Sequence, residues 1–316
     1  MGRILITKRK KMMEHAGEAV ALIVAVSWTA SAMLSEVASK RIGEAVTNVY
    51  RMVLAIAILW LMLEVTGQTS VLTGASGEAW MWLLGSGLVG YTFGDYCLYN
   101  AYAMIGARRT QLFMTLAAPF AALAAWLMLG ETLTWRAGVG MVLTLTGIAM
   151  SVVSRGDAEQ EGTRRLGLKI PRVGVLLATG AAMGQGVGLV LSKIGMNAMG
   201  TEASMAPAAG TIMRGLAGLA GFSVMLFARK KQGGMGEALS GKNMLLLTSL
   251  AVFGPAVGVT LSLKAAQMTE VGIAQTIMAT TPILIIAPAY IIFHQKIGVM
   301  DVVGAVISVA GVAMFF

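Results

Sequence analysis

Charged residues are scarce in this sequence of 316 residues, and their scarcity argues against an ordinary soluble protein. Only 12% of the residues are charged and 57% are hydrophobic, against about 25% and about 45–50% in soluble domains. The apolar stretches run for about 20 residues without the polar alternation of a lumen-facing strand, which favours membrane-spanning helices over a barrel. The sequence therefore predicts an all-α polytopic membrane protein.

Side chains that bind metals or form disulfides are also few. Cys97 is the one cysteine, so the chain can form neither an intramolecular disulfide nor a thiolate metal cluster. The two histidines, His15 and His294, fall at predicted span ends, which does not suit a metal site. A Gly-x-x-x-x-Gly-Lys-Ser/Thr loop is absent as well. We therefore expect no metal, no cofactor and no nucleotide-driven activity.

The net charge of +9 does not indicate nucleic-acid binding, because the basic residues are scattered through short connections and the N-terminal segment 8–11. Contact with anionic lipid headgroups explains such a distribution more simply. We expect membrane lipid as a partner, and no nucleic acid.

Hydropathy windows of about 20 residues predict ten transmembrane helices. They cover residues 17–38, 44–66, 79–105, 108–130, 135–154, 173–195, 205–228, 243–267, 270–293 and 298–316. The longest polar connection, residues 154–172, divides the spans five and five. We therefore predict a first five-helix unit over residues 1–153, a linker over 154–172 and a second unit over 173–316.

The two halves form an internal repeat. An offset of 163 residues places Arg51 on Arg214, and an offset of 164 places Gln111 on Gln275. The same offset of 164 superimposes four glycines, namely Gly90, Gly94, Gly140 and Gly147, on Gly254, Gly258, Gly304 and Gly311. Because five is odd, the second copy enters the membrane from the opposite side. Such inverted repeats, related by an axis in the membrane plane, are typical of transporters.

The fourth and fifth predicted spans carry a proline and glycine pattern. Pro119 lies near the middle of the fourth span, which ends in Leu129-Gly130-Glu131-Thr132-Leu133 and is followed by Gly138, Gly140 and Gly147. With the two five-span copies, this pattern resembles the EamA-like branch of the drug/metabolite transporter superfamily over nearly the whole chain. The resemblance implies ten helices and export of small metabolites. The second copy departs from the pattern, with Pro282 one position out of register and His294-Gln295 in place of Gly-Glu.

Asp95 is the strongest candidate for a functional residue inside a span. The helical period places it on one face with Tyr91, Tyr99 and Tyr102. Burial favours proton uptake by a carboxylate, so Asp95 is predicted to couple transport to protons or to bind a cation. The alternative is a structural Asp95 that tyrosine hydroxyls or an arginine of a neighbouring helix hold in place.

Arg51 and Arg214 are equivalent in the repeat and lie inside predicted spans, where a charge needs a partner. Each is predicted to hold a substrate carboxylate or phosphate or to pair internally, and Arg51 could instead extend to the nearer surface. Trp28 and its repeat counterpart Gln185 are candidates for an aromatic wall and an amide of the site, and the alternative for Trp28 is packing alone. The pair Gln111 and Gln275 is predicted to line the cavity or to bridge helices.

Two further patterns inside the spans concern helix contacts. Glu36 and Lys193 are equivalent in the repeat with opposite charge, so they are predicted either to pair as a gate or to be solvated at the membrane surface. Glycines in the third, sixth and eighth spans predict close helix packing; they are Gly90, Gly94, Gly180, Gly184, Gly188, Gly254 and Gly258.

These patterns together favour a secondary transporter that exports a small amphipathic or zwitterionic metabolite, such as an amino acid, by alternating access. We expect it in the bacterial inner membrane and leave proton coupling open. A flippase for lipids or lipid-linked sugars is the alternative, and an intramembrane enzyme using Asp95 and Glu36 is less favoured. The distribution of Lys and Arg opposes cytoplasmic termini, whereas the family resemblance implies them.

Overall fold

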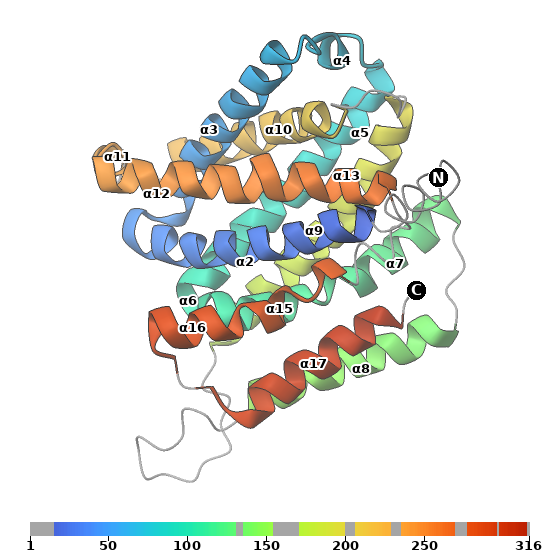
Figure 1. The fold of residues 1–316 in the computed structure, drawn as a ribbon, viewed down its shortest axis with the longest axis vertical. Coiled ribbons are helices and arrows are strands. Elements are labelled where there is room, and N and C mark those ends of the chain that lie inside the picture. Colours follow the sequence, from blue (N-terminus) through green and yellow to red (C-terminus); the bar gives the residue numbers. More distant parts are fainter. Residues whose placement is uncertain are drawn as a thin grey trace, which may run out of the picture.

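The computed structural model describes residues 16–130, 135–153, 171–199, 206–228, 235–268, 277–295 and 297–314. Within these ranges every regular element is a helix (Figure 1), as predicted for an all-α chain. Five helical stretches are long and apolar enough to cross a membrane. They are α2 (Ala16–Ile42), α3 (Glu44–Val65), α9 (Arg172–Ala198), α10 (Ala206–Ala228) and the stretch Gly241–Ala265, which comprises α12 (Gly241–Ala251), η3 (Val252–Val259) and most of α13 (Thr260–Met268).

A bent pair of helices provides a sixth candidate span. It consists of α5 (Gly77–Gly87), η1 (Leu88–Asp95) and α6 (Tyr96–Met114), followed at an angle of 50° by α7 (Ala117–Leu129). Inside α6 the helix is interrupted at Gly106, which has a left-handed φ of 79° that glycine adopts without steric cost. The predicted boundary between spans 79–105 and 108–130 falls at this interruption.

The remaining apolar helical stretches have fewer residues, namely Gly138–Ser151, Thr281–Ile292 and Val299–Ala313. They belong to α8 (Trp135–Val153), α15 (Thr281–Leu284), α16 (Ile286–Phe293) and α17 (Val299–Ala313). The short helices α4 (Ser70–Thr73) and α11 (Met235–Ala238) lie in connections. Large apolar side chains cover the outside, such as Val65 and Phe227, which are 79% and 77% exposed. Such an exterior suits contact with lipid. Residues 154–170 of the predicted linker lie outside the described residues.

The sequence offset of 164 residues reappears in the helix boundaries. Helix α5 begins at Gly77 and α12 at Gly241, and α7 begins at Ala117 while α15 begins at Thr281. The π-helical segments η1 and η3 occupy equivalent positions, eight residues in each copy. The predicted α-helical period therefore does not hold across these segments, where the hydrogen bonds follow the wider π-helical pattern.

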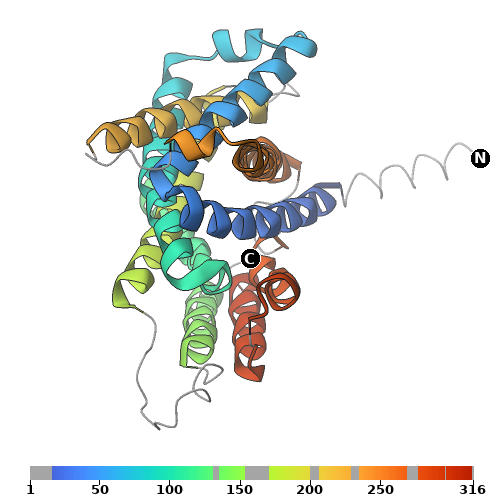
Figure 2. The same ribbon diagram turned by 90° about the vertical axis from the view of Figure 1, so that its left-hand side faces the viewer.

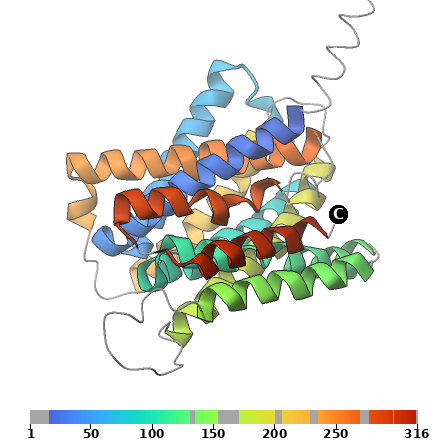
Figure 3. The ribbon, with the colours of Figure 1, turned by 60° about the horizontal axis from the view of Figure 1, so that its bottom comes forward.

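Helices α8 and α17 pack against each other with reciprocal contacts, and they lie side by side in Figures 2 and 3. Thr144 Oγ1 donates a hydrogen bond to Ser308 O at 3.4 Å, and Ser308 Oγ donates to Thr144 O at 3.3 Å. A Cβ on Gly147 would lie 2.5 Å from Gly304 O, and a Cβ on Gly304 would lie 2.5 Å from Gly147 O. Reciprocal contacts between equivalent residues are what a local two-fold axis produces.

Glycines let η1 and α9 approach at backbone distance, as the glycine pattern predicts. A Cβ on Gly184 would lie 2.7 Å from Gly94 Cα, and a Cβ on Gly188 would lie 3.0 Å from Gly90 Cα. This crossing brings the third and sixth predicted spans together and so positions side chains of both halves around the centre of the molecule.

Candidate functional site

A cavity with about 1120 Å³ of empty space, its open part included, lies between helices of the two halves. Eight of the nine predicted site residues line it, namely Trp28, Arg51, Tyr91, Asp95, Tyr99, Gln111, Gln185 and Arg214. Gln275 lies outside the described residues. The structure therefore brings the candidates together, while their roles in binding stay predictions.

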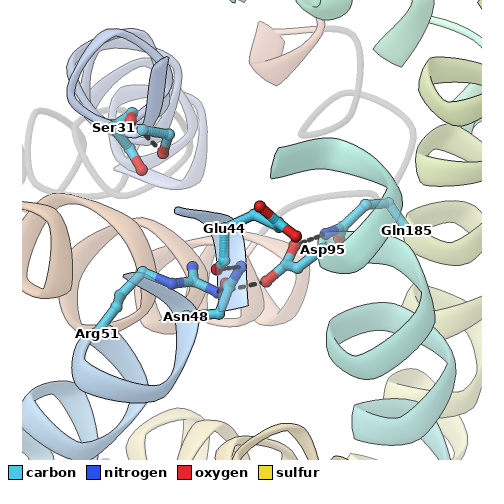
Figure 4. Close-up of polar contacts among 7 residues, drawn as sticks. Ser31, Glu44, Asn48, Arg51, Asp95 and Gln185 are labelled. Carbon is cyan, nitrogen blue, oxygen red and sulfur yellow. Dashed lines mark hydrogen bonds and ion pairs between the residues drawn. The ribbon is translucent and has the colours of Figure 1, made fainter. Parts of the chain in front are cut away.

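Arg51 and Asp95 form a buried ion pair at one side of the cavity. Arg51 Nη2 lies 2.5 Å from Asp95 Oδ2, and the two residues are 4% and 2% exposed. Gln185 Nε2 donates to the other oxygen, Asp95 Oδ1, at 3.1 Å, and Arg51 Nη2 also donates to Asn48 Oδ1 at 2.7 Å (Figure 4). The predicted extension of Arg51 to the surface is therefore wrong, because its charge is compensated inside. Asp95 is thus held by an arginine of a neighbouring helix, which is one of the alternatives given for it above.

Three helices position this pair. Asp95 is the last residue of η1, Arg51 lies on α3 and Gln185 lies on α9. The guanidinium carbon of Arg51 also lies 4.8 Å from the ring centroid of Tyr99, within the range of a cation–π contact. Since an unpaired charge is costly in a low-dielectric interior, these contacts explain how a cation and an anion are both retained there.

Arg214 has different surroundings from its repeat equivalent Arg51. It is 3% exposed, and its guanidinium carbon lies 5.0 Å from the ring centroid of Tyr91. Among the residues that the structure describes, no carboxylate lies within 4.0 Å of the Arg214 guanidinium. Arg214 Nε and the hydroxyl oxygen of Tyr91 are both buried without a hydrogen-bond partner. Two polar groups with unused hydrogen-bonding capacity therefore lie at this side of the cavity.

Another side of the cavity is formed by aromatic rings and a glutamine side chain. Gln111 Nε2 donates to Tyr102 Oη at 2.6 Å, and the rings of Tyr102 and Tyr99 meet edge to face with centroids 5.8 Å apart. Two residues that the sequence did not single out, Ser31 and Ser35, line the cavity from α2 together with Trp28. Their spacings of three and four residues from one another are those of one helical face, a signal that was available in the sequence.

Glu36 takes neither of the two predicted roles. Its side chain is buried at 3% exposure, contacts Lys40 Nζ at 2.5 Å and accepts a hydrogen bond from Ala107 N at 2.7 Å. The carboxylate thus caps the helical segment that restarts after Gly106. Lys193 is exposed. Surface solvation of Glu36 and a gate between Glu36 and Lys193 are therefore wrong for this structure, because the Gly106 interruption exposes a backbone N–H that needs an acceptor.

A second ion pair, between residues that the sequence did not single out, joins the two halves away from the cavity. Arg108 Nη1 on α6 lies 2.8 Å from Asp301 Oδ2 on α17, with both side chains largely buried. Ser151 Oγ on α8 donates to Asp301 Oδ1 at 3.2 Å. No sequence offset relates these residues, so only the packing of α17 brings them together.

Comparisons with known proteins agree with this architecture. The model of the EamA-like transporter family matches residues 15–153 and again residues 172–316. Among solved structures, 23 chains match. One of them, described only as the crystal structure of a protein, has a TM-score of 0.65 at 17% identity over 95% of this chain and 96% of that chain, which shows a shared fold. The search of curated proteins gave no match. The chain therefore belongs to the EamA-like transporter family of the drug/metabolite transporter superfamily, whose members are integral membrane transporters and not enzymes.

Proposed function

We propose that this protein is a secondary transporter with ten membrane-spanning helices, which exports a small amphipathic metabolite across the bacterial inner membrane. The observation that carries the proposal is the cavity, because it lies between the two halves and collects eight side chains singled out in the sequence. Its mixture of aromatic rings, amides and charged groups suits a ligand with a polar and an apolar part.

The ten-span arrangement is supported by the equivalence of the two halves. The bent segment α5–η1–α6–α7 has a counterpart in α12–η3–α13 and α15–α16, and α8 has a counterpart in α17. The family model also matches the chain twice, with a break close to the predicted linker over 154–172. An odd number of spans in each copy inverts the second copy relative to the first. If each half adopts the conformation of the other, the cavity then closes on one side of the membrane and opens on the other.

Alternating access is supported by contacts that each arginine makes with the opposite half. A Cβ on Gly90 of the first half would lie 3.0 Å from Arg214 Nη2, and a Cβ on Gly254 of the second half would lie 3.6 Å from Arg51 Nη1. A movement of one half against the other must therefore change the surroundings of both guanidinium groups. The Arg108–Asp301 pair also crosses between the halves, so it opens if those helices separate.

Proton coupling through Asp95 is the finer part of the proposal. While Arg51 and Gln185 hold the carboxylate, both of its oxygens have partners. A movement of the second half would take Gln185 away from Asp95 Oδ1, and a desolvated carboxylate that loses a hydrogen-bond donor then favours protonation more. Uptake and release of the proton would thus follow the conformation.

The test is transport by purified protein in vesicles loaded with a mixture of small amphipathic metabolites, including amino acids and organic monocarboxylates, whose appearance outside is followed by mass spectrometry with and without a pH gradient. We expect export that the gradient drives, and loss of the gradient dependence in folded Asp95→Asn protein. Arg172→Gln is the matched control because Arg172 is exposed at the start of α9. Translocation of a fluorescent lipid without release of any soluble compound would contradict export and favour a flippase.

A further inference from the structure

Arg214 introduces a positive charge into the cavity that the described residues do not compensate. Among the lining residues that the structure describes, only Arg51, Asp95 and Arg214 carry formal charge. Because Arg51 and Asp95 neutralise each other at 2.5 Å, the described lining residues carry a net charge of about one positive unit. An uncompensated charge in a low-dielectric site is unfavourable, so an anion that enters the cavity gains the attraction of Arg214 without competing against a bound carboxylate.

The groups around Arg214 suit an oxygen anion. Its guanidinium stacks over the Tyr91 ring, and both Arg214 Nε and Tyr91 Oη are buried without partners. A guanidinium presents parallel N–H groups that match the two oxygens of a carboxylate, and a phenol O–H can donate a further hydrogen bond. Because Gly90 has no side chain, the guanidinium can pack closely against the backbone of η1; a Cβ there would lie 3.0 Å from Arg214 Nη2.

We propose that Arg214, with the hydroxyl of Tyr91, binds the carboxylate of the transported molecule, and that the substrates are amphipathic organic monocarboxylates. This inference rests on the proposed function and names its substrate class. The cavity also has apolar lining residues that can accommodate the body of such a molecule; they include Trp28, Leu98, Leu189, Val259 and Met278.

The same geometry disfavours a zwitterion such as an amino acid. A carboxylate is the strongest acceptor for an ammonium group, and Asp95 is the one carboxylate among the described lining residues. Both oxygens of Asp95 are already held, one by Arg51 and the other by Gln185. A substrate ammonium that binds Asp95 would therefore have to compete with a buried ion pair, whereas a carboxylate without an ammonium group need not.

The experiment compares four compounds that share a phenylalkyl body and differ in charge. They are 3-phenylpropionate as the anion, 3-phenylpropionamide as its neutral counterpart, 3-phenylpropylamine as the cation and phenylalanine as the zwitterion. Binding to purified protein in lipid nanodiscs is measured by calorimetry. We expect the wild-type protein to bind the anion about 10- to 100-fold more tightly than the amide, and phenylalanine and the amine more weakly than the anion.

The Arg214→Gln variant should bind the anion and the amide with similar affinity, and Arg214→Lys should retain part of the preference because it keeps the charge without the fork. Arg172→Gln, which removes an exposed arginine outside the cavity, should behave as the wild type. If Arg214→Gln does not fold, the other two variants decide. The assignment is overturned if Arg214→Lys and Tyr91→Phe both prefer the anion over the amide as strongly as the wild type does.

Three other outcomes would also overturn it: no binding of the anion by the wild type, equal binding of anion and amide, or saturation of the site by chloride alone. Failure of the proposed function is distinguishable in vesicles. If binding depends on Arg214 but no compound moves across the membrane, the proposed transport function is wrong and the proposed carboxylate site stands. If 3-phenylpropionate and phenylalanine are transported equally well, the proposed transport function stands and the proposed substrate class is wrong.

Discussion

Arg51 and Arg214 occupy equivalent positions in the two halves of the chain but meet different chemistry. Arg51 reaches Asp95 and Asn48, whereas Arg214 faces the ring of Tyr91 without a carboxylate among the described residues. The residue 164 positions after Asp95 is Val259, so the second half lacks the counter-charge that the first half has. Duplication therefore preserved the backbone geometry, while one acidic residue made one arginine part of the scaffold and left the other available.

The same contrast appears at the ends of α7 and α16. Gly130 and His294 are separated by 164 residues, and both adopt the left-handed conformation that ends a helix, with φ values of 68° and 49°. Glycine takes this conformation without strain, whereas a residue with a Cβ does so at a cost. The departure of the second half from the Gly-Glu pattern is thus a change of side chain within an unchanged turn.

The largest expected effect is a loss of stability that distinguishes the two arginines. Asp95→Asn or Arg51→Gln should each lower the free energy of unfolding by about 3–5 kcal/mol, because each leaves a buried charge without its partner. Arg214→Gln should leave the stability unchanged or raise it, since it removes an uncompensated charge. Melting of the purified variants in one detergent measures this, and the double variant Arg51→Gln/Asp95→Asn should cost less than the sum of the single changes. Equal destabilisation by Arg51→Gln and Arg214→Gln would contradict the difference.

A second comparison concerns Glu36 and its repeat equivalent Lys193. Glu36→Ala should cost about 1.5–3 kcal/mol, because Ala107 N–H then loses a charged acceptor, and Glu36→Gln should cost less since an amide oxygen can still accept. Lys193→Ala should change the stability by no more than about 0.5 kcal/mol, because its side chain is exposed. The same melting experiment applies, and an effect of Lys193→Ala as large as that of Glu36→Ala would show that the two positions are equally structural.

Glycine positions offer a third comparison, between a helix crossing and a free helix face. Gly184→Ala should cost about 1–3 kcal/mol, since its Cβ would lie 2.7 Å from Gly94 Cα and 2.9 Å from Val89 O. Gly85→Ala is the matched control, because nothing lies within 4 Å of a Cβ at Gly85. Its stability should stay the same or rise by up to about 1 kcal/mol from helix propensity. Equal melting temperatures for the two variants would argue against the close crossing.

The smallest expected effect concerns the left-handed ends of the helices. His294→Gly should raise the free energy of unfolding by about 1 kcal/mol, because it relieves a non-glycine residue at positive φ, and Gly130→Ala should lower it by a similar amount. Both changes are read from melting of the purified protein. A loss of stability in His294→Gly would show that the imidazole makes contacts which outweigh the backbone strain.

Much of the site could be predicted from the sequence because membrane-embedded polar residues are costly and therefore few. Asp95, Arg51 and Arg214 stand out in apolar spans on that ground alone, and all three line the cavity. The buried role of Glu36 could not be predicted, because it depends on the interruption at Gly106, which hydropathy does not detect. The Arg108–Asp301 pair likewise required the contact between α6 and α17.

By itself the sequence determined the all-helical membrane character, the duplication and the residues with chemistry to offer, because these follow from composition, apolar run length and a constant offset. Only the tertiary structure decided which charges are paired. Arg51 and Arg214 are equivalent in the repeat, yet the carboxylate of Asp95 forms its ion pair with Arg51. Electrostatic compensation depends on distances of a few ångströms between segments far apart in the chain, and sequence periodicity carries no information about such distances.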